Sequence, residues 1–246
     1  MSRASGRALR ALPGGSACVG AFLFFLLVPL AGCRDSGTGP SGAARQTVSG
    51  LVFAAGDTLI FDAWNYDAYN EIVAASHTTP FWKVYAVNDT WAGAANVTSI
   101  QEFSPPAEPP GKTDTLRFRF LSNGDIYQYG FIARVVMRRE GVRLAPSWDR
   151  IAAFSLPSTA TWAVGTADTT GLDTLRGTVN GDEQYFVAML NGVKTVFHGY
   201  GVSLSSLDLE YTIIVSDIPP AFLVIEEAST PIANGFLLNL ASLTKH

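Results

Sequence analysis

The chain has 246 residues, of which 48% are hydrophobic and 15% are charged, and it contains three His and two Cys. This composition excludes a disordered protein, a coiled coil and a small domain held together by disulfides. The 17 basic and 21 acidic residues give a net charge of -4. That balance argues against a phosphate backbone as the main partner, so no nucleic-acid binding is expected.

The first 32 residues have the pattern of a secretory signal sequence. Arg3, Arg7 and Arg10 form a basic start without acidic residues, and the apolar run 17–30 follows them. This run is shorter than the roughly 20 residues that a membrane-spanning helix needs. The pattern therefore predicts export of the protein, with residues 1–32 as the signal peptide.

The leader ends in the four residues Leu30-Ala31-Gly32-Cys33. They resemble the lipobox of bacterial lipoproteins, which lies at the end of a short hydrophobic segment. The resemblance implies cleavage between Gly32 and Cys33 by the type II signal peptidase, a diacylglycerol on the Cys33 sulfur and an acyl group on its new amino group. Two or three such chains anchor a protein stably, whereas one does not. We therefore expect lipidation at Cys33 and a membrane as the partner of the N-terminus.

The residue after the cysteine indicates which membrane is expected to hold the anchor. The lipoprotein class keeps a protein at the inner membrane when Asp follows the cysteine, and here that position is Arg34. By this resemblance we expect an anchor in the outer membrane of the cell envelope, facing the periplasm or the cell surface. The rest of 33–50 is rich in Gly, Ser and Ala, which predicts a flexible tether with an r.m.s. reach of about 20 Å.

The two cysteines leave no thiol for the folded part of the chain. Cys18 lies in the leader and Cys33 is expected to carry lipid, so the predicted domain 51–246 contains no cysteine. Disulfides, cysteine metal sites and cysteine nucleophiles are therefore excluded there. No metal-ligand or cofactor motif occurs elsewhere, so no metal and no cofactor are predicted. Without the three leader arginines, 14 basic residues stand against 21 acidic ones, a net charge of -7.

The domain 51–246 is predicted to be all-β, with about a dozen antiparallel strands in a curved sheet, an open barrel or a sandwich. Its apolar segments are short, β-branched and aromatic, and Gly, Asn, Asp and Pro separate them. No segment shows a sustained helical period with caps, and at most one or two helical turns are expected, around 147–151. The predicted strands are 50–54, 57–64, 71–77, 81–88, 94–103, 114–121, 125–138, 149–155, 173–179, 182–190, 193–201, 208–216, 221–227 and 235–243.

The Pro-rich segment 104–112 interrupts this pattern. Its four prolines cannot lie in a central strand. We interpret it as an exposed loop within a single domain 51–246. The alternative is a boundary at 104–112 between two smaller domains.

Asn-Gly pairs predict two-residue hairpin turns, because a type I′ turn needs a positive φ at both central residues. Such a turn at Asn123-Gly124 would place Phe118 opposite Tyr129 on an apolar face and Gln128 on the polar face. Large apolar pairs across two strands stabilise a sheet. The register therefore predicts which side of this hairpin is the core.

Further Asn-Gly pairs at 180–181 and 191–192 would join three strands into a meander. The two turns place Arg176, Tyr185 and His198 in one row across the sheet. This row brings together a guanidinium, a phenol and an imidazole, and it is the best candidate for a binding site in the domain. The alternative is that these residues form the solvated face of a half-buried sheet.

Other residues are weaker candidates for a site. Glu183 is predicted beside Tyr200 on the face of that row. Trp91 and Trp148 lie next to turn residues, where an exposed Trp could stack on a sugar or line a lipid cavity; a place in the core is the alternative. Arginines cluster at 134–143 and would meet anionic headgroups or a partner, unless they only solvate a strand end.

The lipidated N-terminus, the chain length and the run of antiparallel strands together resemble the half-barrel lipoprotein carriers of the LolA and LolB type. The resemblance implies that an acyl chain or another hydrophobic ligand lies between the concave face of the sheet and a covering loop or helix. The predicted scarcity of helix departs from those carriers. The first functional hypothesis is a membrane-anchored envelope lipoprotein whose β domain binds a hydrophobic small molecule or an envelope protein, without catalysis.

Two alternatives remain open. One is a carbohydrate-active or other hydrolytic β-sandwich enzyme, which would need two carboxylates across a cleft, with Glu183 or Asp149 among them. The other is a tandem of immunoglobulin-like domains, split at 104–112, with a structural or adhesive role. The hydrolase, P-loop and zinc-protease motifs do not occur in the sequence, so no catalytic residue is assigned. The oligomeric state leaves no signal in the sequence.

Overall fold

The structure, a computed structural model, describes most of the predicted domain. It covers residues 48–67, 69, 71–103, 114–165, 175–180, 183–206, 209–229 and 235–246. These residues belong to one unit, Ala44–His246. The signal peptide, the predicted cleavage site between Gly32 and Cys33, the predicted lipidation site Cys33, and the segment 104–112 lie outside the described residues. Within the described ranges, no helix combines the length and the apolar composition needed to cross a membrane.

The fold is all-β, as the sequence predicts, and its strands form one 13-stranded sheet. The described chain has one α-helix, α1 (Phe131–Glu140), and a 3-10 helix, η1 (Ala74–Ser76). The strands are β1 (Thr58–Asn65), β2 (Phe81–Trp91), β3 (Ala94–Phe103), β4 (Asp114–Phe120), β5 (Ile126–Tyr129), β6 (Trp148–Ala152), β7 (Thr161–Ala163), β8 (Arg176–Val179), β9 (Gln184–Leu190), β10 (Val193–Ser205), β11 (Leu209–Asp217), β12 (Pro220–Ser229) and β13 (Phe236–Thr244).

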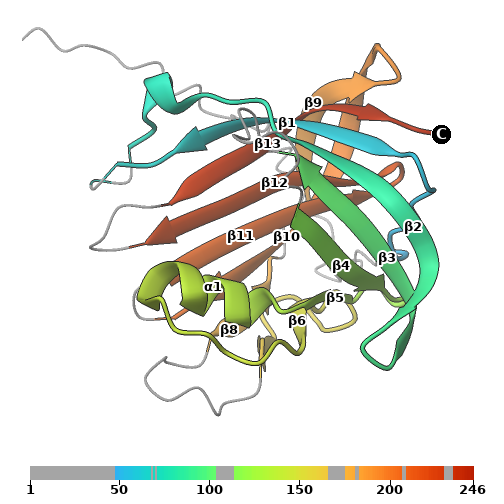
Figure 1. Cartoon of the computed structure of the whole chain (residues 1–246). Helices are drawn as coiled ribbons and strands as arrows, with labels where there is room; N and C mark the ends of the chain where they lie inside the picture. Colours follow the sequence, from blue (N-terminus) through green and yellow to red (C-terminus); the bar gives the residue numbers. More distant parts are fainter. Residues whose placement is uncertain are drawn as a thin grey trace, which may run out of the picture. The chain divides into compact units, whose positions relative to one another are not determined.

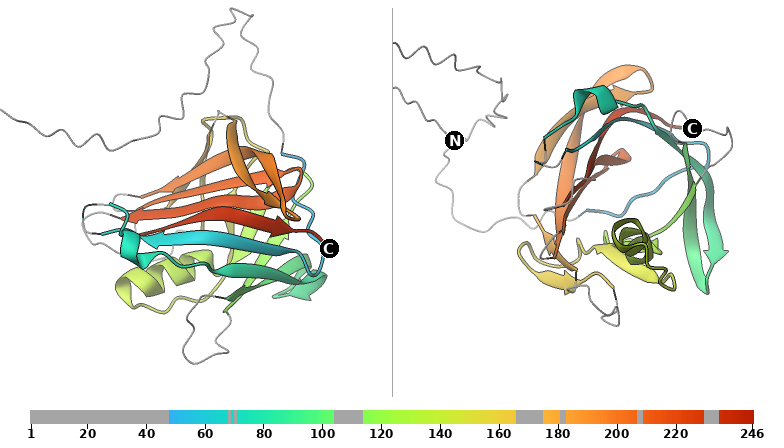
Figure 2. Two further views of the ribbon diagram at one scale, coloured as in Figure 1. Left: turned by 90° about the horizontal axis from the view of Figure 1, so that it is seen from above. Right: turned by 60° about the vertical axis from the view of Figure 1, so that its left-hand side comes forward.

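The sheet curls until its two end strands meet (Figures 1 and 2). The strand order is β6-β5-β4-β3-β2-β1-β13-β12-β11-β10-β8-β7. At the meeting point the backbone N–H of Arg150 in β6 donates to the carbonyl of Val164 at 3.0 Å. The indole N–H of Trp162 in β7 donates to the carbonyl of Arg150 at 2.7 Å. The sheet therefore surrounds an interior. Strands β3 and β4, which precede and follow the segment 104–112, are antiparallel neighbours in this one sheet.

Strand β9 closes a second, smaller ring. It pairs antiparallel with β10 and parallel with β13, so β9 to β13 form a closed five-stranded barrel, here called the small barrel. Phe186 and Ile214 pack so tightly inside it that a Cβ on Gly199 would lie 2.7 Å from the Phe186 ring. Phe197 is fully buried. The small barrel is therefore filled by its own side chains.

One end of the molecule is sealed by segments from both ends of the domain, and we call it the closed end (right in Figure 1, at the C-terminus). Residues 48–57 cross it, with Leu51 and Phe53 buried. The buried carboxylate of Asp57 accepts a hydrogen bond from the backbone N–H of His246 at 3.0 Å and also binds the ammonium of Lys245. The predicted strand at 50–54 is wrong, because this segment covers the closed end and is not a strand of the sheet.

Helix α1 lies at the opposite end, which we call the mouth (left in Figure 1). The strand predicted at 125–138 is wrong beyond Tyr129, where β5 ends and α1 begins two residues later. Phe131 and Val135 are buried one helical turn apart, a spacing typical of a helix face rather than a strand. Gly130 and Gly141 bound the helix with left-handed conformations, φ 70° and 68°. The β-branched composition of the segment hid this helical period.

Three further predictions of local structure are wrong. The helical turn expected at 147–151 is strand β6, which pairs with β5. The strand expected at 71–77 contains η1, because this segment is solvent-exposed and has no apolar face to pack on the sheet. The hairpin at Asn123-Gly124 has a three-residue loop with Gly124 at φ 89°, so Phe118 faces Gln128 and not Tyr129. The longer loop shifts the register by one residue, which moves Gln128 to the inner face.

Candidate ligand-binding cavity

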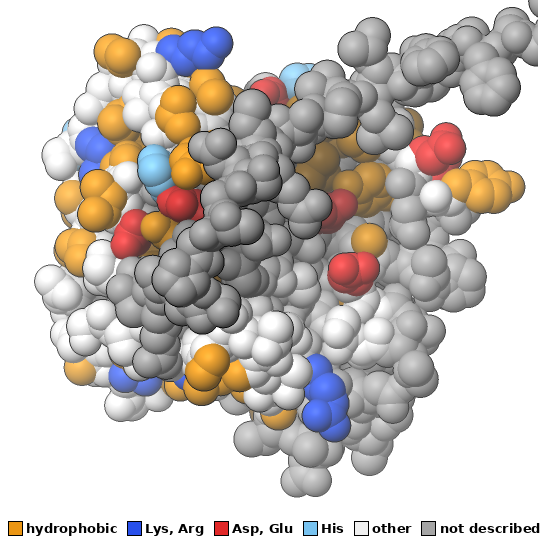
Figure 3. All heavy atoms as spheres, turned by 180° about the vertical axis from the view of Figure 1, so that it is seen from behind, with side chains coloured by type: hydrophobic (Ala, Val, Ile, Leu, Met, Phe, Trp, Pro, Cys, Tyr) orange, Lys and Arg blue, Asp and Glu red, His pale blue; other side chains and the backbone are white. Residues whose placement is uncertain are grey.

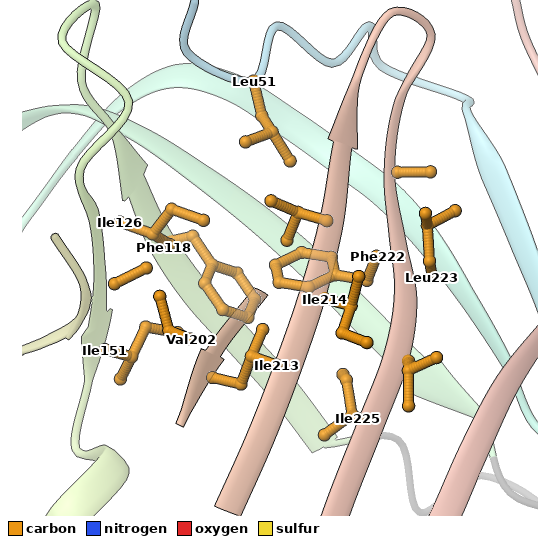
Figure 4. Packing of buried hydrophobic residues seen from close by; sticks show 14 of the residues in the cluster. Leu51, Phe118, Ile126, Ile151, Val202, Ile213, Ile214, Phe222, Leu223 and Ile225 are labelled. Carbon is orange, nitrogen blue, oxygen red and sulfur yellow. The ribbon is translucent and has the colours of Figure 1, made fainter. Parts of the chain in front are cut away.

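A cavity of about 520 Å³ lies inside the curled sheet, between its inner face and α1. Its volume is within the range of about 300–1,000 Å³ that small-molecule sites have. Its walls are mainly aromatic and aliphatic. Figure 4 shows several of these side chains pointing toward one another from strands far apart in the sequence. The apolar lining residues include Ala63, Trp82, Leu116, Phe118, Phe131, Val135, Ile151, Ile213, Phe222, Ile225, Phe236 and Leu238.

The sequence builds this wall through strands that are apolar on both faces. In β11, Ile213 lines the cavity, whereas the next residue, Ile214, packs against Gly199 inside the small barrel. Consecutive side chains of a strand point to opposite faces. A strand that separates two apolar interiors therefore needs apolar side chains on both faces, and the consecutive buried residues Ile213, Ile214 and Val215 of β11 meet that need.

Aromatic rings separate the cavity from the closed end. The ring of Phe222 lies 5.3 Å from that of Phe118 and 5.5 Å from that of Trp82, between centroids. On its other side Phe53, from the segment that crosses the closed end, stacks on Phe222 at 6.4 Å. Such contacts add about 0.5–1.5 kcal/mol per pair to the burial of the rings. The cavity therefore has an aromatic floor, and its opening is at the mouth.

Charged side chains gather at the mouth, and we call Glu102, Asp114, Arg134, Arg138 and Glu227 the rim. Arg134 of α1 pairs with Asp114 of β4 at 3.3 Å, and both side chains are well exposed. Arg138, one helical turn further, pairs with the buried carboxylate of Glu227 on β12. The two ion pairs attach α1 to opposite walls of the cavity.

Glu102 is the rim residue that reaches into the cavity without an ion pair at close range. Its carboxylate accepts a hydrogen bond from the indole N–H of Trp82 at 3.3 Å. Burial raises the pKa of Glu102, although this hydrogen bond and the nearby charges of Arg134 and Arg138 partly oppose the shift. Beside it, burial raises the pKa of Tyr211, which stays neutral. The cavity is thus apolar at its floor and polar at its mouth.

Asp149 positions the first turn of α1. Its carboxylate accepts hydrogen bonds from the backbone N–H of Ile132 at 2.9 Å and from the hydroxyl of Ser147 at 2.7 Å. These bonds lower the pKa of Asp149, but burial has the larger effect and raises it. A carboxylate near a helix N-terminus satisfies backbone N–H groups that have no partner within the helix. Asp149, a candidate for the hydrolytic alternative, therefore has a structural role here.

The row predicted at 176–198 is only partly present. Tyr185 does lie opposite His198, with ring centroids 4.9 Å apart, and a carboxylate oxygen of Glu183 lies 2.5 Å from Nδ1 of His198. Glu183 also lies beside Tyr200, as predicted, and burial together with Glu183 raises the pKa of Tyr200. This group is on the outer face of β9 and β10, away from the cavity.

Arg176 is not in that row. Strand β8 pairs with β10 instead of β9, so Arg176 lies opposite Ser205 and Ala163. The backbone N–H of Asn180 donates to the carbonyl of Gly201 at 2.9 Å, which holds the end of β8 against the middle of β10. The pairing of β8 with β9 predicted from the Asn-Gly pair at 180–181 is therefore wrong, although Gly181 itself lies outside the described residues. The register predicted from the turn at 191–192 is confirmed.

Trp91 and Trp148 lie together on the outer face of β2 to β6. The guanidinium of Arg117 stacks over Trp91 at 3.5 Å, and Tyr129 contacts both indoles, with ring centroids 6.4 Å and 5.3 Å away. Trp91 is 40% exposed and Trp148 is half-buried. Neither lines the cavity. Their side chains cover the outer surface of the sheet.

The sequence interpretation singled out the arginine cluster 134–143, which supplies Arg134 and Arg138, but it missed the acidic residues of the rim. Glu102 and Asp114 lie at strand ends and Glu227 in an apolar strand, and they meet α1 only in three dimensions. The detectable signal was the four-residue spacing of Arg134 and Arg138, which places both on one helix face. Within the described part of the chain, no three His, Cys, Asp or Glu side chains form a group that could hold a metal ion.

Comparisons with known proteins add little to the description of this site. No protein-family model and no curated protein matches the chain. A candidate lipoprotein from Parabacteroides distasonis is similar at 9% identity and a TM-score of 0.36, over 80% of this chain and 98% of that chain. A candidate exported protein with a YmcC-like fold, from Bacteroides fragilis, is similar at 9% identity and a TM-score of 0.38, over 80% and 100%. TM-scores below 0.5 establish no common fold or site. The resemblance to LolA and LolB gains no support from them.

Proposed function

We propose that this protein is an envelope lipoprotein whose curled sheet binds a single-chain amphiphile, with the hydrocarbon chain in the cavity and the polar head at the rim. The observation that carries the proposal is the cavity of about 520 Å³ with apolar walls and one polar end. Burying a methylene group contributes about 0.8 kcal/mol, so a chain of a dozen carbons has ample driving force to enter. The helix that covers the cavity matches what the carrier hypothesis requires.

The rim favours a head group that can both donate and accept hydrogen bonds. Arg134 and Arg138 offer guanidinium N–H groups, and Glu102 offers a carboxyl with a raised pKa. Gln128, which the register shift turns inward, adds an amide to the lining. A fatty acid or a lysophospholipid presents such a head on one chain. A two-chain lipid would need more room than the cavity offers.

The binding test uses purified mature protein and cis-parinaric acid, a fluorescent fatty acid, with native mass spectrometry to count bound molecules. We expect saturable binding of one molecule and its displacement by palmitate or by a lysophospholipid. Ile213→Trp places a larger side chain into the cavity and should abolish binding. Tyr85→Trp, at a position 67% exposed on the outer side of β2, is the matched control and should bind normally.

Two results would overturn the ligand-binding proposal. One is the absence of saturable binding by the unaltered protein. The other is equal binding by the Ile213→Trp variant, since a ligand that ignores a filled cavity binds elsewhere. Circular dichroism and thermal melting of each variant show that a loss of binding is not a loss of fold.

The membrane anchor is tested separately in cells grown with an alkyne fatty acid. The protein should take up the label and fractionate with membranes, and Cys33→Ala should lose both properties. Cys18→Ala is the matched control, because Cys18 lies in the predicted leader and should leave labelling unchanged. Separation of inner and outer membranes then tests the location that Arg34 favours. Label on the Cys33→Ala variant would contradict lipidation at this residue.

A further inference from the structure

The closed end carries exposed aliphatic side chains on three separate segments. Val52, in the segment that crosses this end, is 77% exposed between the buried Leu51 and Phe53. Ile218, in the turn between β11 and β12, is also 77% exposed, and Val193, at the tip of the β9–β10 hairpin, is 66% exposed. Single exposed aliphatic residues are normal on a protein surface, but a group of them marks an interaction site.

Direct contacts place these segments at the same end. Ser49 donates its backbone N–H and its hydroxyl to the carboxylate of Asp217, both at 2.9 Å, which joins the first segment to the β11–β12 turn. At the hairpin, the side chain of Asn191 accepts a hydrogen bond from the backbone N–H of Lys245 at 2.8 Å. Lys245 in turn binds Asp57 at the end of the first segment. The three aliphatic side chains therefore lie on segments that meet at one end of the molecule.

The outer face of the hairpin carries further exposed apolar side chains. Val187 and Val196 are cross-strand partners, 56% and 55% exposed, and Tyr185 and Met189 flank Val187 on β9. In Figure 3 hydrophobic side chains gather on the side of the molecule that carries this hairpin. Lys194, beside Val193, is exposed and adds a positive charge at the tip. Aliphatic side chains with an adjacent Lys suit the boundary between lipid chains and head groups.

The chain also enters the domain at this end. Val48, the first described residue, lies against Gly124, which precedes β5, and Phe154, which follows β6. Both residues are at the closed end of the molecule. Between it and Cys33 stand residues 33–47, which span at most about 50 Å when extended and about 20 Å as a flexible chain. A lipid on Cys33 therefore keeps the closed end close to the membrane surface.

We propose that the closed end is a membrane-contact surface, in which Val52, Val193 and Ile218 enter the head-group region of the bilayer that holds the anchor. This inference rests on the proposed lipidation of Cys33. The anchor supplies proximity, and the aliphatic side chains fix the orientation of the domain. The mouth then faces away from the bilayer, toward the aqueous side.

The domain 51–246 contains no cysteine, and the Cys33 sulfur, once it carries diacylglycerol, does not react with thiol probes, so a single introduced cysteine is labelled selectively. Single cysteines replace Val193 or Ile218 in the lipidated protein, and Val142→Cys, at a position 47% exposed just after α1, is the matched control. Each carries an environment-sensitive fluorophore. The proteins are reconstituted in vesicles of equal parts phosphatidylethanolamine and phosphatidylglycerol that contain a doxyl-labelled quencher lipid.

We expect quenching and a blue shift at positions 193 and 218, and neither change at 142. In the protein labelled at 218, Val193→Asp should reduce the quenching, whereas Val142→Asp should not. No quenching at 193 and 218, or equal quenching at all three positions, would overturn the inference. Failure of the anchor itself is recognised independently, because the alkyne label would then be absent from the protein and the vesicles would not retain it.

Discussion

At the closed end, segments from both termini of the domain meet around the buried carboxylate of Asp57, and aromatic rings fill the space behind it. At the mouth, α1 is attached by two ion pairs between side chains, Arg134 with Asp114 and Arg138 with Glu227. The first arrangement ties together the backbone of distant segments, whereas beyond its first turn, which Asp149 holds, α1 is attached through side chains. Local stability therefore differs between the closed end and the mouth. The segments of a protein that admit ligands are drawn from its less stable regions.

The largest expected effect distinguishes the filled small barrel from the cavity wall. Phe197→Ala should lower the free energy of unfolding by about 3–5 kcal/mol, because it leaves a void among closely packed side chains. Phe118→Ala should cost less, since part of its ring already faces the cavity, and it should let the protein bind bulkier chains. Denaturation in urea and displacement of cis-parinaric acid measure the two effects. An equal loss of unfolding free energy in both variants would mean that side chains pack as closely in the cavity wall as in the small barrel.

The next effect concerns the seal at the closed end. Asp57→Ala removes the acceptor for the backbone N–H groups of Ala54 and His246 and the partner of Lys245. We expect a loss of about 2–3 kcal/mol in unfolding free energy, as for buried hydrogen bonds to a charged group, with ligand affinity unchanged. Asp62→Ala, which breaks an exposed pair with His77, is the control and should cost below about 1 kcal/mol. A weakened ligand affinity in Asp57→Ala would show that the two ends are coupled.

Detaching α1 should have a smaller and local effect. Arg138→Ala removes the guanidinium that pairs with the buried carboxylate of Glu227, and we expect about 1–2 kcal/mol, reduced because Arg138 is itself well exposed. Hydrogen exchange should become faster in Phe131–Glu140 and stay unchanged in β9. Arg134→Ala breaks the exposed pair with Asp114 and should cost below about 1 kcal/mol. Faster exchange in β9 would contradict the independence of the two ends.

The smallest effect is a pH dependence at the mouth. Burial raises the pKa of Glu102 above its unfolded value, so the folded state holds its proton more tightly than the unfolded state. The contribution of Glu102 to stability is thus fully present below the unfolded pKa and is lost as pH rises through the folded pKa. Glu102→Gln removes this dependence, and we expect the variant to gain stability relative to the wild type as the pH rises above the unfolded pKa of a glutamate, about 4.3. A constant difference over this rise in pH would show that Glu102 does not titrate differently on folding.

Much of the sheet could be predicted from the sequence because a strand leaves a local signal. Strand β3 matches its prediction at both ends, and the turn at 191–192 correctly sets Tyr185 opposite His198. In the hairpin around Gly124, by contrast, a third loop residue changed the register and moved Gln128 to the opposite face. Loop length is decided by backbone conformation, which the Asn-Gly pair does not fully specify.

The candidate site could not be predicted in the same way, because its parts are distant in sequence. Glu102 and Glu227 are separated by most of the domain and come together only when the sheet curls. Helix α1 was hidden because Val135 and Val136 favour strand formation, and tertiary packing of Phe131 and Val135 outweighs that preference. An apolar strand such as β11 indicates burial on both faces, but it does not say that one of those faces borders a cavity.

The contact between β6 and β7 has a consequence for proteins that share a membrane. A sheet with open edges presents unpaired backbone groups that can recruit a strand from another molecule. Here the N–H and carbonyl of Arg150 are occupied by Val164 and Trp162, so the two end strands protect each other. Anchored molecules meet one another far more often than molecules free in solution. Under the proposed lipidation of Cys33, copies share one membrane, and this contact covers the sheet edge at Arg150 against pairing between their sheets.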